Sequence, residues 1–284
     1  MSVAALGRPV ERVAAPSRAR EWSGAVLNAY LVAFFAFMFA PLAIMVAAAF
    51  NSYPSPSVTQ WSGFTLEWFA AIPRDARIVS GLGNTLLIAA GVIAIAIPLG
   101  TAGALVLSRL ESGANAVLYT VLVSPIMMPG IVLGVTSMIF WRDAFGVQAG
   151  LFTATMAQAS FIASYVMLLV MARLSRQDRT LDEAAADLGA SPLFAFRRVT
   201  LPFLAPALVS AALIAFLQSV ENFPTTFFSI GPDHTLVTEI ASRMRFGLSP
   251  MLNAIGVLFI AVTVAFAALW SMLRMRERTA RPRT

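Results

Sequence analysis

Six long apolar runs divide the chain, at residues 24–50, 84–107, 117–140, 149–174, 204–230 and 251–273. A helix needs about 20 apolar residues to cross the hydrocarbon core of a bilayer, and each run reaches that length. Charged residues make up only 12% of the chain, too few to cover the surface of a water-soluble domain. We therefore predict an all-α, polytopic membrane protein with six transmembrane helices.

The two ends of the chain differ from this apolar body. The first run follows a basic N-terminus and ends near Ala47 and Ala49, which imitate a signal-peptide cleavage site. It is longer than the roughly 7–15-residue core of a signal peptide, so we expect a retained anchor. Residues 1–23 and 274–284 are polar and are predicted to be disordered tails, with residues 24–273 as one transmembrane domain.

The positions of the arginines predict the orientation of the chain. Most of them lie in the two tails and in the segments after the second and fourth runs. The other side holds Arg74, Arg77, Arg142, Arg243 and Arg245. Because positively charged loops stay in the cytoplasm, both termini are predicted to be cytoplasmic. This asymmetry and contact with anionic lipid explain the net charge of +6, so no nucleic-acid partner is predicted.

Residues 175–203 form a polar segment between the fourth and fifth runs, predicted as a cytoplasmic helix-turn-helix. Thr180 and Glu183 have the spacing of a capping box, which predicts a helix start. Gly189 provides the left-handed residue that ends a helix, and the Ser191-Pro192 pair predicts a second helix start. Each helix is shorter than the about 12–15 residues that an isolated helix needs in water, so packing against another surface must hold it.

Two kinds of surface could hold this segment. An amphipathic loop can lie on lipid headgroups with its arginines near the phosphates. An anionic leaflet would repel Asp182, Glu183 and Asp187, which favours a protein partner with a groove.

The sequence of this segment resembles the EAA loop of the membrane subunits of ABC importers. It has Glu183-Ala184-Ala185, Gly189 four residues later, and then Leu201-Pro202, with Val199 where isoleucine is usual. The resemblance implies the ABC type I importer permease fold and a loop, residues 181–202, that docks on a cytoplasmic ATPase. The residues carried over as ATPase-coupling are Glu183, Ala184, Ala185, Gly189, Leu201 and Pro202.

The same resemblance implies the partners and cofactors. The expected partners are two ATP-binding subunits, a homologous second permease subunit and an extracytoplasmic substrate-binding protein. ATP and magnesium are expected in the ATPase subunits, so no cofactor is predicted in this chain.

The sequence offers no candidate catalytic or metal site. It lacks lysine, which a P-loop needs to reach the terminal phosphates of a nucleotide, so it cannot be an ATPase of that type. Cysteine is absent, and the single histidine, His234, is expected to be a solvated loop residue rather than a metal ligand. No nucleophile, base and orienting residue can be assembled, so we predict a transport subunit and not an enzyme.

Proline and glycine predict breaks in two of the spans. Ser124-Pro125 and Met128-Pro129-Gly130 lie near the middle of the third span, and Pro98, Gly100 and Gly103 lie in the second. Proline leaves carbonyls unpaired, which a membrane tolerates where helices pack or line a cavity. A packing kink and a role in lining a pore both remain open. Small residues of the fourth span, such as Ala157 and Ser164, predict close helix contact.

Three polar residues in the fifth span are candidates for the substrate path: Gln218, Glu221 and Asn222. An intramembrane carboxylate costs about 2.5 kcal/mol or more to insert, so Glu221 should face a cavity or a partner. A structural hydrogen bond to a neighbouring helix is the alternative. A Glu221 that lines the path would favour a cationic substrate.

Further segments resemble the second permease subunit of spermidine/putrescine-type importers. They are Phe50-Asn51-Ser52, Trp61-Ser62-Gly63-Phe64-Thr65, Trp68, Glu221-Asn222-Phe223, Thr225-Thr226, Gly231, Thr235-Leu236, residues 245–250 and Asn253-Ala254. Relatives often have two acidic residues where this chain has Glu221-Asn222, and often proline where Val237 stands. The resemblance implies import of polyamines or a related small polar solute. The alternatives are an ABC importer for another substrate and a stand-alone ion-coupled carrier.

Overall fold

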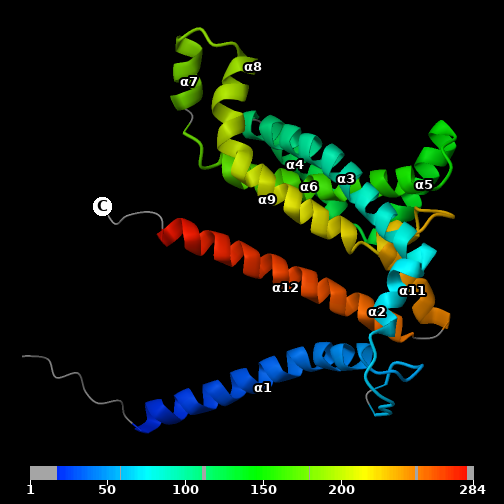
Figure 1. Ribbon diagram of the computed structural model, residues 1–284. Coiled ribbons are helices and arrows are strands. Elements are labelled where there is room, and N and C mark those ends of the chain that lie inside the picture. Colours follow the sequence, from blue (N-terminus) through cyan, green and yellow to red (C-terminus); the bar gives the residue numbers. More distant parts are fainter. Residues whose placement is uncertain (1–17, 58, 111–112, 179, 247–248, 280–284) are drawn as a thin grey trace, which may run out of the picture. The chain divides into compact units, whose positions relative to one another are not determined.

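The computed structural model describes residues 18–57, 59–110, 113–178, 180–246 and 249–279. These residues are mainly helical, and within them the extended backbone forms only an isolated antiparallel bridge between Asn51 and Phe64. The chain falls into two compact units (Figure 1). Unit 1 comprises Met1–Trp68 and Pro250–Thr284, and unit 2 comprises Phe69–Ser249.

In unit 1 the first and last helices of the chain, α1 (Arg18–Ala49) and α12 (Pro250–Thr279), pack against each other. Both are longer than expected. Residues 18–23 and 274–279 are helical, so the prediction of disorder is wrong for these parts of the tails; the remaining tail residues lie outside the described ranges. The reason is local, because both stretches are rich in arginine, glutamate, methionine or alanine, which are good helix formers.

Asn51 organises the segment that follows α1. Its side chain is buried, donates to the carbonyls of Ser57 and Gln60 at 2.7 Å each, and accepts from the amide of Ser62 at 3.1 Å. The indole of Trp68 donates to the Asn51 carbonyl at 2.8 Å. These bonds fix a loop that has no regular secondary structure of its own, up to the short helix α2 (Glu67–Ala71).

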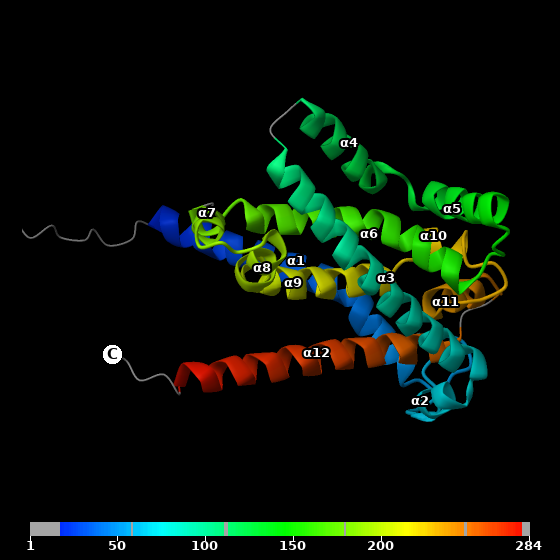
Figure 2. The ribbon, with the colours of Figure 1, turned by 90° about the horizontal axis from the view of Figure 1, so that it is seen from above.

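Three helices form the core of unit 2: α3 (Ala76–Arg109), α6 (Leu151–Leu174) and α9 (Leu201–Val220). They lie side by side in both ribbon views (Figures 1 and 2), and α3 makes its most extensive helix contact with α6. Buried apolar side chains from all three meet in one cluster that includes Val92, Ile162 and Leu204.

Small residues let α3 and α6 approach closely. A Cβ atom on Gly100 would lie 2.5 Å from the Ala163 carbonyl oxygen and 2.8 Å from the Met167 amide nitrogen, closer than side-chain atoms tolerate. Ala157 and Ser164 of α6 are buried. The close packing predicted for the fourth span is therefore confirmed.

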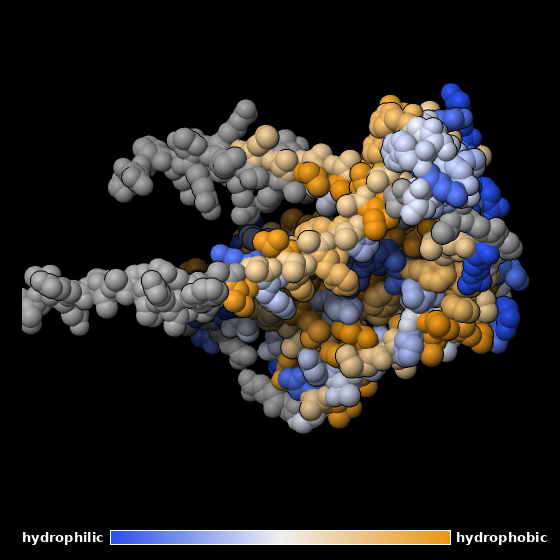
Figure 3. Space-filling model, turned by 90° about the horizontal axis from the view of Figure 1, so that it is seen from below, coloured by the Kyte–Doolittle hydropathy of each residue, from blue (hydrophilic) through white to orange (hydrophobic). Residues whose placement is uncertain are grey.

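Among the residues that the structure describes, four helices are long and apolar enough to cross a membrane: Val26–Ala49 within α1, α3, α6, and the continuous helix Pro192–Val220. A bent helix pair adds a fifth if it is counted as one span, and the described apolar part of α12, Pro250–Ala265, is shorter. The expected all-α fold with several apolar helices is confirmed, while the count of six spans stays a prediction. Hydrophobic colour runs along much of the helix surface in Figure 3, as contact with lipid requires.

The third span is broken as predicted. Helices α4 (Ala114–Met127) and α5 (Gly130–Phe145) meet at an angle of 106°. Met128 is extended, as a residue before proline prefers, and Pro129 has no N–H to continue the helix. The other predicted proline, Pro125, lies inside α4.

The second span is not broken, so the predicted interruption at Pro98 is wrong. The α3 helix runs through Pro98, and it starts at Ala76, before the apolar run 84–107 begins. It begins earlier because Asp75 is the N-cap residue: its carboxylate accepts from the amides of Arg77 at 3.1 Å and Ile78 at 3.2 Å. The α3 helix packs on α6 along this stretch, where Gly100 lies against Ala163 and Met167.

The fifth span also differs from its prediction. Helix α8 (Pro192–Ala195) continues through a π-helical turn, η2 (Phe196–Thr200), into α9 without a break at Leu201-Pro202. It then ends at Val220 and not at Ile230, because Pro224 has no N–H to bond the Val220 carbonyl. A separate short helix, α10 (Pro224–Phe227), follows.

We predict that Gly100→Ala lowers the stability of the chain. The added methyl group has no space between α3 and α6, and overpacking of this kind costs about 1–3 kcal/mol. Thermal unfolding in detergent, followed by tryptophan fluorescence, should show a lower midpoint.

Gly83→Ala in the same helix is the matched control. A Cβ atom there meets nothing within 4 Å. Alanine favours a helix over glycine by about 1 kcal/mol, so the midpoint should stay or rise. Equal shifts in the two variants would contradict the packing argument.

Candidate functional site

The polar segment forms a knob of two short helices, α7 (Thr180–Asp187) and α8, at one end of unit 2 (Figure 1). We call this the α7 end. The predicted capping box is wrong, because Thr180 is already the first helical residue and its amide donates to the Asp178 carboxylate at 3.0 Å. This hydrogen bond lowers the pKa of Asp178.

The predicted turn between the two helices is confirmed. Gly189 has φ +77°, and the amides of Ala190 and Gly189 donate to the carbonyls of Ala185 and Ala186 at 3.0 and 2.9 Å. This is the Schellman pattern, which places glycine in the left-handed position. The hydroxyl of Ser191 accepts from the amide of Phe194 at 3.3 Å and caps α8, as predicted.

The tip of the knob is apolar and exposed. The side chain of Leu188 is 89% exposed, and Leu193 and Phe194 are 62% and 56% exposed. A shallow pocket at the tip is lined by Ala185, Leu188, Gly189, Ala190, Ser191 and Phe194. Apolar side chains gathered on an exposed polar element mark a surface for a partner.

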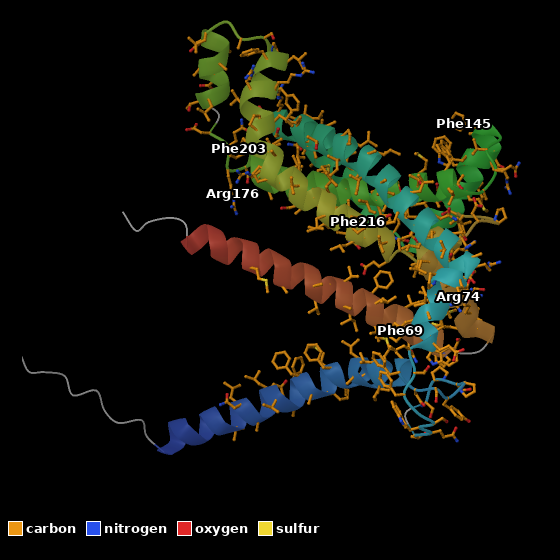
Figure 4. The ribbon with its side chains drawn as sticks, in the orientation of Figure 1. Phe69, Arg74, Phe145, Arg176, Phe203 and Phe216 are labelled. Atoms are coloured by element: carbon orange, nitrogen blue, oxygen red, sulfur yellow. The ribbon has the colours of Figure 1, made fainter. Side chains whose placement is uncertain are left out.

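The base of the knob contacts the helical core at one point, and a cavity separates the two at another. Arg173 of α6 lies 4.2 Å from the ring of Phe203 and donates to its carbonyl at 3.1 Å, and Figure 4 labels Phe203 at this end. A cavity of about 560 Å³ lies beside this contact, with Glu183 of α7, Arg109 of α3 and Thr200 in its wall. Helix α7 makes its main helix contact with α8.

The structure therefore places the predicted coupling residues in two groups, one on the knob and one at the start of α9. Glu183 and Ala184 are exposed on α7, Ala185 is half-buried beneath the turn, and Gly189 makes the turn itself. Leu201 and Pro202 are the first residues of α9, exposed and beyond the π-helical turn.

The predicted path residues lie at the opposite end of α9, about 30 Å away at 1.5 Å per helical residue. Gln218 is half-buried within the helix. Glu221 is the exposed C-cap residue, so it lies in the break between α9 and α10 rather than inside a helical span. The side chain of Asn222 accepts from the amide of Thr225, the second residue of α10, at 3.1 Å.

The breaks of the third and fifth spans meet at this point. A Cβ atom on Gly130, the first residue of α5, would lie 2.8 Å from the hydroxyl of Thr225 in α10. One on Gly134 would lie 2.5 Å from the Thr225 carbonyl oxygen. Non-helical backbone at membrane depth has to be enclosed by protein or line a cavity. Because the two breaks contact each other, each one helps to enclose the non-helical backbone of the other.

A network of four charged residues, which the sequence analysis missed, joins α3 to α11 (Leu236–Phe246). Arg243 donates to both oxygens of Asp75, at 2.7 and 3.0 Å, and to Glu239 at 2.8 Å. Glu239 also accepts from Arg77 at 3.0 Å and is only 4% exposed. The i,i+4 spacing of Glu239 and Arg243 was the available signal. We call this end of unit 2 the α11 end; Figure 4 labels Arg74 there.

The network shifts the pKa values of Asp75, Glu239 and Arg243. Hydrogen bonds from Arg243 lower the pKa of Asp75, and Asp75 raises the pKa of Arg243. Burial raises the pKa of Glu239, but hydrogen bonds from Arg77 and Arg243 outweigh it, so the pKa lies below its ordinary value. Both carboxylates therefore stay ionised at neutral pH.

His234 is not the solvated loop residue that was expected. It is half-buried, and its Nε2 atom lies 3.1 Å from the Ser80 hydroxyl and 3.0 Å from the Arg77 carbonyl oxygen. Its own carbonyl accepts from Asn84 at 2.8 Å, so it packs on the start of α3. Within the described ranges, no group of three or more His, Cys, Asp or Glu side chains could hold a metal ion.

Comparison with known proteins gives consistent matches over most of the chain. The family described as "Binding-protein-dependent transport system inner membrane component" matches residues 94–276. The putrescine transport system permease protein PotI of Escherichia coli K12 is 34% identical over 257 residues, covering 87% of this chain and 90% of PotI. The spermidine/putrescine transport system permease protein PotC of the same strain is 25% identical over 251 residues, covering 88% and 94%.

Solved structures show the same fold. A bacterial ABC transporter that imports the acidic polysaccharide alginate has a chain with a TM-score of 0.68 at 14% identity, covering 92% of this chain and 98% of that one. A chain of the MetNI methionine ABC transporter, in inward-facing conformations, has a TM-score of 0.55 at 21% identity, covering 77% and 100%.

We predict that the attachment of α11 to α3 is insensitive to pH from 7 down to about 5 and weakens progressively below about 4. Asp75 and Glu239 have lowered pKa values in the folded chain. Their stabilisation is therefore complete above the ordinary values of about 3.9 and 4.3 and disappears as the pH falls through the lower folded values. Hydrogen exchange of the α11 amides as a function of pH measures this.

The double variant Asp75→Asn, Glu239→Gln should lose the dependence, with fast exchange at every pH. Asp143→Asn, which removes an exposed ion pair with Arg142, should keep the native profile. A native profile in the double variant would show that the network does not hold α11.

Proposed function

Because the chain belongs to the family of binding-protein-dependent transport system inner membrane components, we propose that it forms half of the substrate pathway of an ATP-driven ABC importer. It is homologous to the putrescine and spermidine/putrescine permease subunits PotI and PotC. The observation that carries the proposal is the exposed apolar knob, joined by one continuous helix to a polar break where two spans are interrupted.

The knob is the proposed contact with the ATPase. Its residues Glu183-Ala184-Ala185 and Gly189 match the EAA loop, and Leu188 beside them is almost fully exposed. Two ATP-binding subunits, which hold ATP and magnesium, a second homologous permease and an extracytoplasmic binding protein complete the proposed importer. The alginate importer has been solved in complex with a periplasmic protein that binds an alginate pentasaccharide.

The orientation follows from the same assignment. The α7 end is cytoplasmic, with both termini on that side, and the α11 end faces the other side of the bacterial inner membrane. The excess of arginine in the tails and in the residues that flank the knob supports this arrangement.

Coupling proceeds through the helix Pro192–Val220. Its 29 residues form one element, about 44 Å long at 1.5 Å per residue, with the knob at one end and Glu221 at the other. When ATP closes the two ATPase subunits, the knob moves with them, and a continuous helix transmits that displacement to the break. The two permease subunits rock between inward-facing and outward-facing states in this scheme.

The proposed substrate is a polyamine or a related small cationic solute. Glu221 lies at the C-terminus of a 20-residue helix, where the helix dipole disfavours a negative charge. A passing cation relieves this unfavourable placement. Gln218 and Asn222 lie next to Glu221 in the sequence and are the other proposed path residues.

We predict that Glu183→Lys and Gly189→Pro abolish ATP-dependent uptake and co-purification of the ATPase, while the chain still inserts in the membrane. The first variant reverses a charge on the contact surface. The second cannot adopt the positive φ of the turn. Uptake into proteoliposomes and pull-down of the ATPase measure the two effects.

Glu67→Lys and Gly146→Pro are the matched controls. Glu67 is an exposed glutamate outside the knob, and Gly146 ends α5 with φ +67°. Both should leave the ATPase bound. Normal ATPase association in Gly189→Pro would refute the docking role, and solute uptake driven by an ion gradient without ATPase would establish the stand-alone carrier instead.

We predict that Glu221→Gln raises the apparent KM for putrescine about tenfold, which corresponds to about 1.4 kcal/mol of lost attraction for the cation. Transport assays with radiolabelled putrescine and the complete importer measure the change. Glu67→Gln removes the same charge elsewhere and should leave the KM unaltered. An unchanged KM in Glu221→Gln would exclude Glu221 from the substrate path.

A further inference from the structure

Gln158 is a buried amide in an apolar helix. It lies in α6, is 1% exposed and is surrounded by buried neighbours such as Ala157 and Ala159. A buried amide without hydrogen bonds is costly in apolar surroundings, so its bonds define what it does.

Both ends of the Gln158 amide are bonded, and to different elements. The carbonyl oxygen accepts from the hydroxyl of Ser219, in the last turn of α9, at 2.5 Å. The nitrogen donates to the hydroxyl of Thr226, in α10, at 2.6 Å. Gln158 therefore bridges the two sides of the break that contains Glu221.

The bridge continues into the backbone of the break. The Thr226 hydroxyl accepts from Gln158 and donates to the Asn222 carbonyl oxygen at 2.5 Å. The amide of Asn222 donates to the Ser219 carbonyl at 3.3 Å. Each hydroxyl has a single proton and donates it in one hydrogen bond. The hydrogen bonds of the network therefore all run in one direction, and together they fix one backbone conformation.

The other side of the break is fixed by close packing. Gly130 and Gly134 of α5 leave no space beside Thr225, which is 1% exposed. With α5 on one side and Gln158 on the other, residues 221–223 cannot relax into a continuation of the helix. The direction of the Glu221 side chain follows from this backbone.

We infer that Gln158 is a positioning residue for transport: it sets the conformation of the break and so presents the Glu221 carboxylate to a cationic substrate. The inference rests on the proposed function. It assigns to a residue outside the substrate path control over the affinity of the path for its substrate. Gln158 itself is buried and does not contact the substrate.

The test is a double-mutant cycle in the complete importer, with Gln158→Leu, Glu221→Gln and both together. Gln158→Leu keeps the volume and removes both bonds. We expect the apparent KM for putrescine to rise about three- to tenfold with the ATPase rate retained, and the double variant to match Glu221→Gln, because coupled residues are not additive. Independent, multiplicative effects, or a loss confined to the maximal rate, would overturn the inference.

Ser164→Ala is the matched control in the same helix. Its buried hydroxyl donates to the Leu122 carbonyl of α4, away from the break, at 2.5 Å. Its KM should remain native. Ser219→Ala and Thr226→Val remove one partner each and serve if Gln158→Leu fails to fold; the same direction of change in KM is expected, with the larger effect in Thr226→Val.

A wild-type importer that does not take up putrescine would refute the proposed substrate without deciding the role of Gln158. Hydrogen exchange then decides it. Faster exchange of the amides of residues 221–226 in Gln158→Leu than in Ser164→Ala supports the positioning role, and equal exchange overturns it.

Discussion

Polar groups in an apolar environment need hydrogen bonds from the protein itself, and the chain meets this requirement at its prolines and at its helix breaks. Pro125 leaves the Val121 carbonyl without its helical donor, and the hydroxyl of Ser124 donates to it at 2.8 Å. In the break after α9, the hydroxyl of Thr226 donates to the Asn222 carbonyl. Within the described part of the chain, every buried side-chain nitrogen or oxygen has a partner. Each interruption is therefore a defined conformation.

The same requirement separates two glutamates with different roles. Glu239 is buried and bonded to two arginines, so its charge is balanced inside the protein and it serves to attach α11. Glu221 is exposed at a helix C-terminus and forms no ion pair with another described residue. A carboxylate in that position gains from an external cation, which is the physical basis of its proposed role.

The packed helices in the core of unit 2 link the α7 end to the α11 end. Gly100 lets the backbones of α3 and α6 approach each other closely. The helix Pro192–Val220 packs on both and joins the knob to the break. A cavity separates α7 from the core and α7 makes its main helix contact with α8, so the helix Pro192–Val220 is the connection between the knob and the packed helices, as the proposed coupling requires.

The sequence by itself determined the class of the protein and the elements that depend on neighbouring residues. Apolar run length predicted the helices, Gly189 and Ser191 predicted the turn of the knob, and Pro129 predicted the break of the third span. Only the tertiary structure decided which prolines interrupt a helix: Pro98 is accommodated by the packing of α3 on α6, whereas Pro224 ends α9. It also decided where Glu221 lies and that Gln158 bridges the break, because residues far apart in the chain meet only after the helices pack, and their hydrogen bonds leave no local pattern in the sequence.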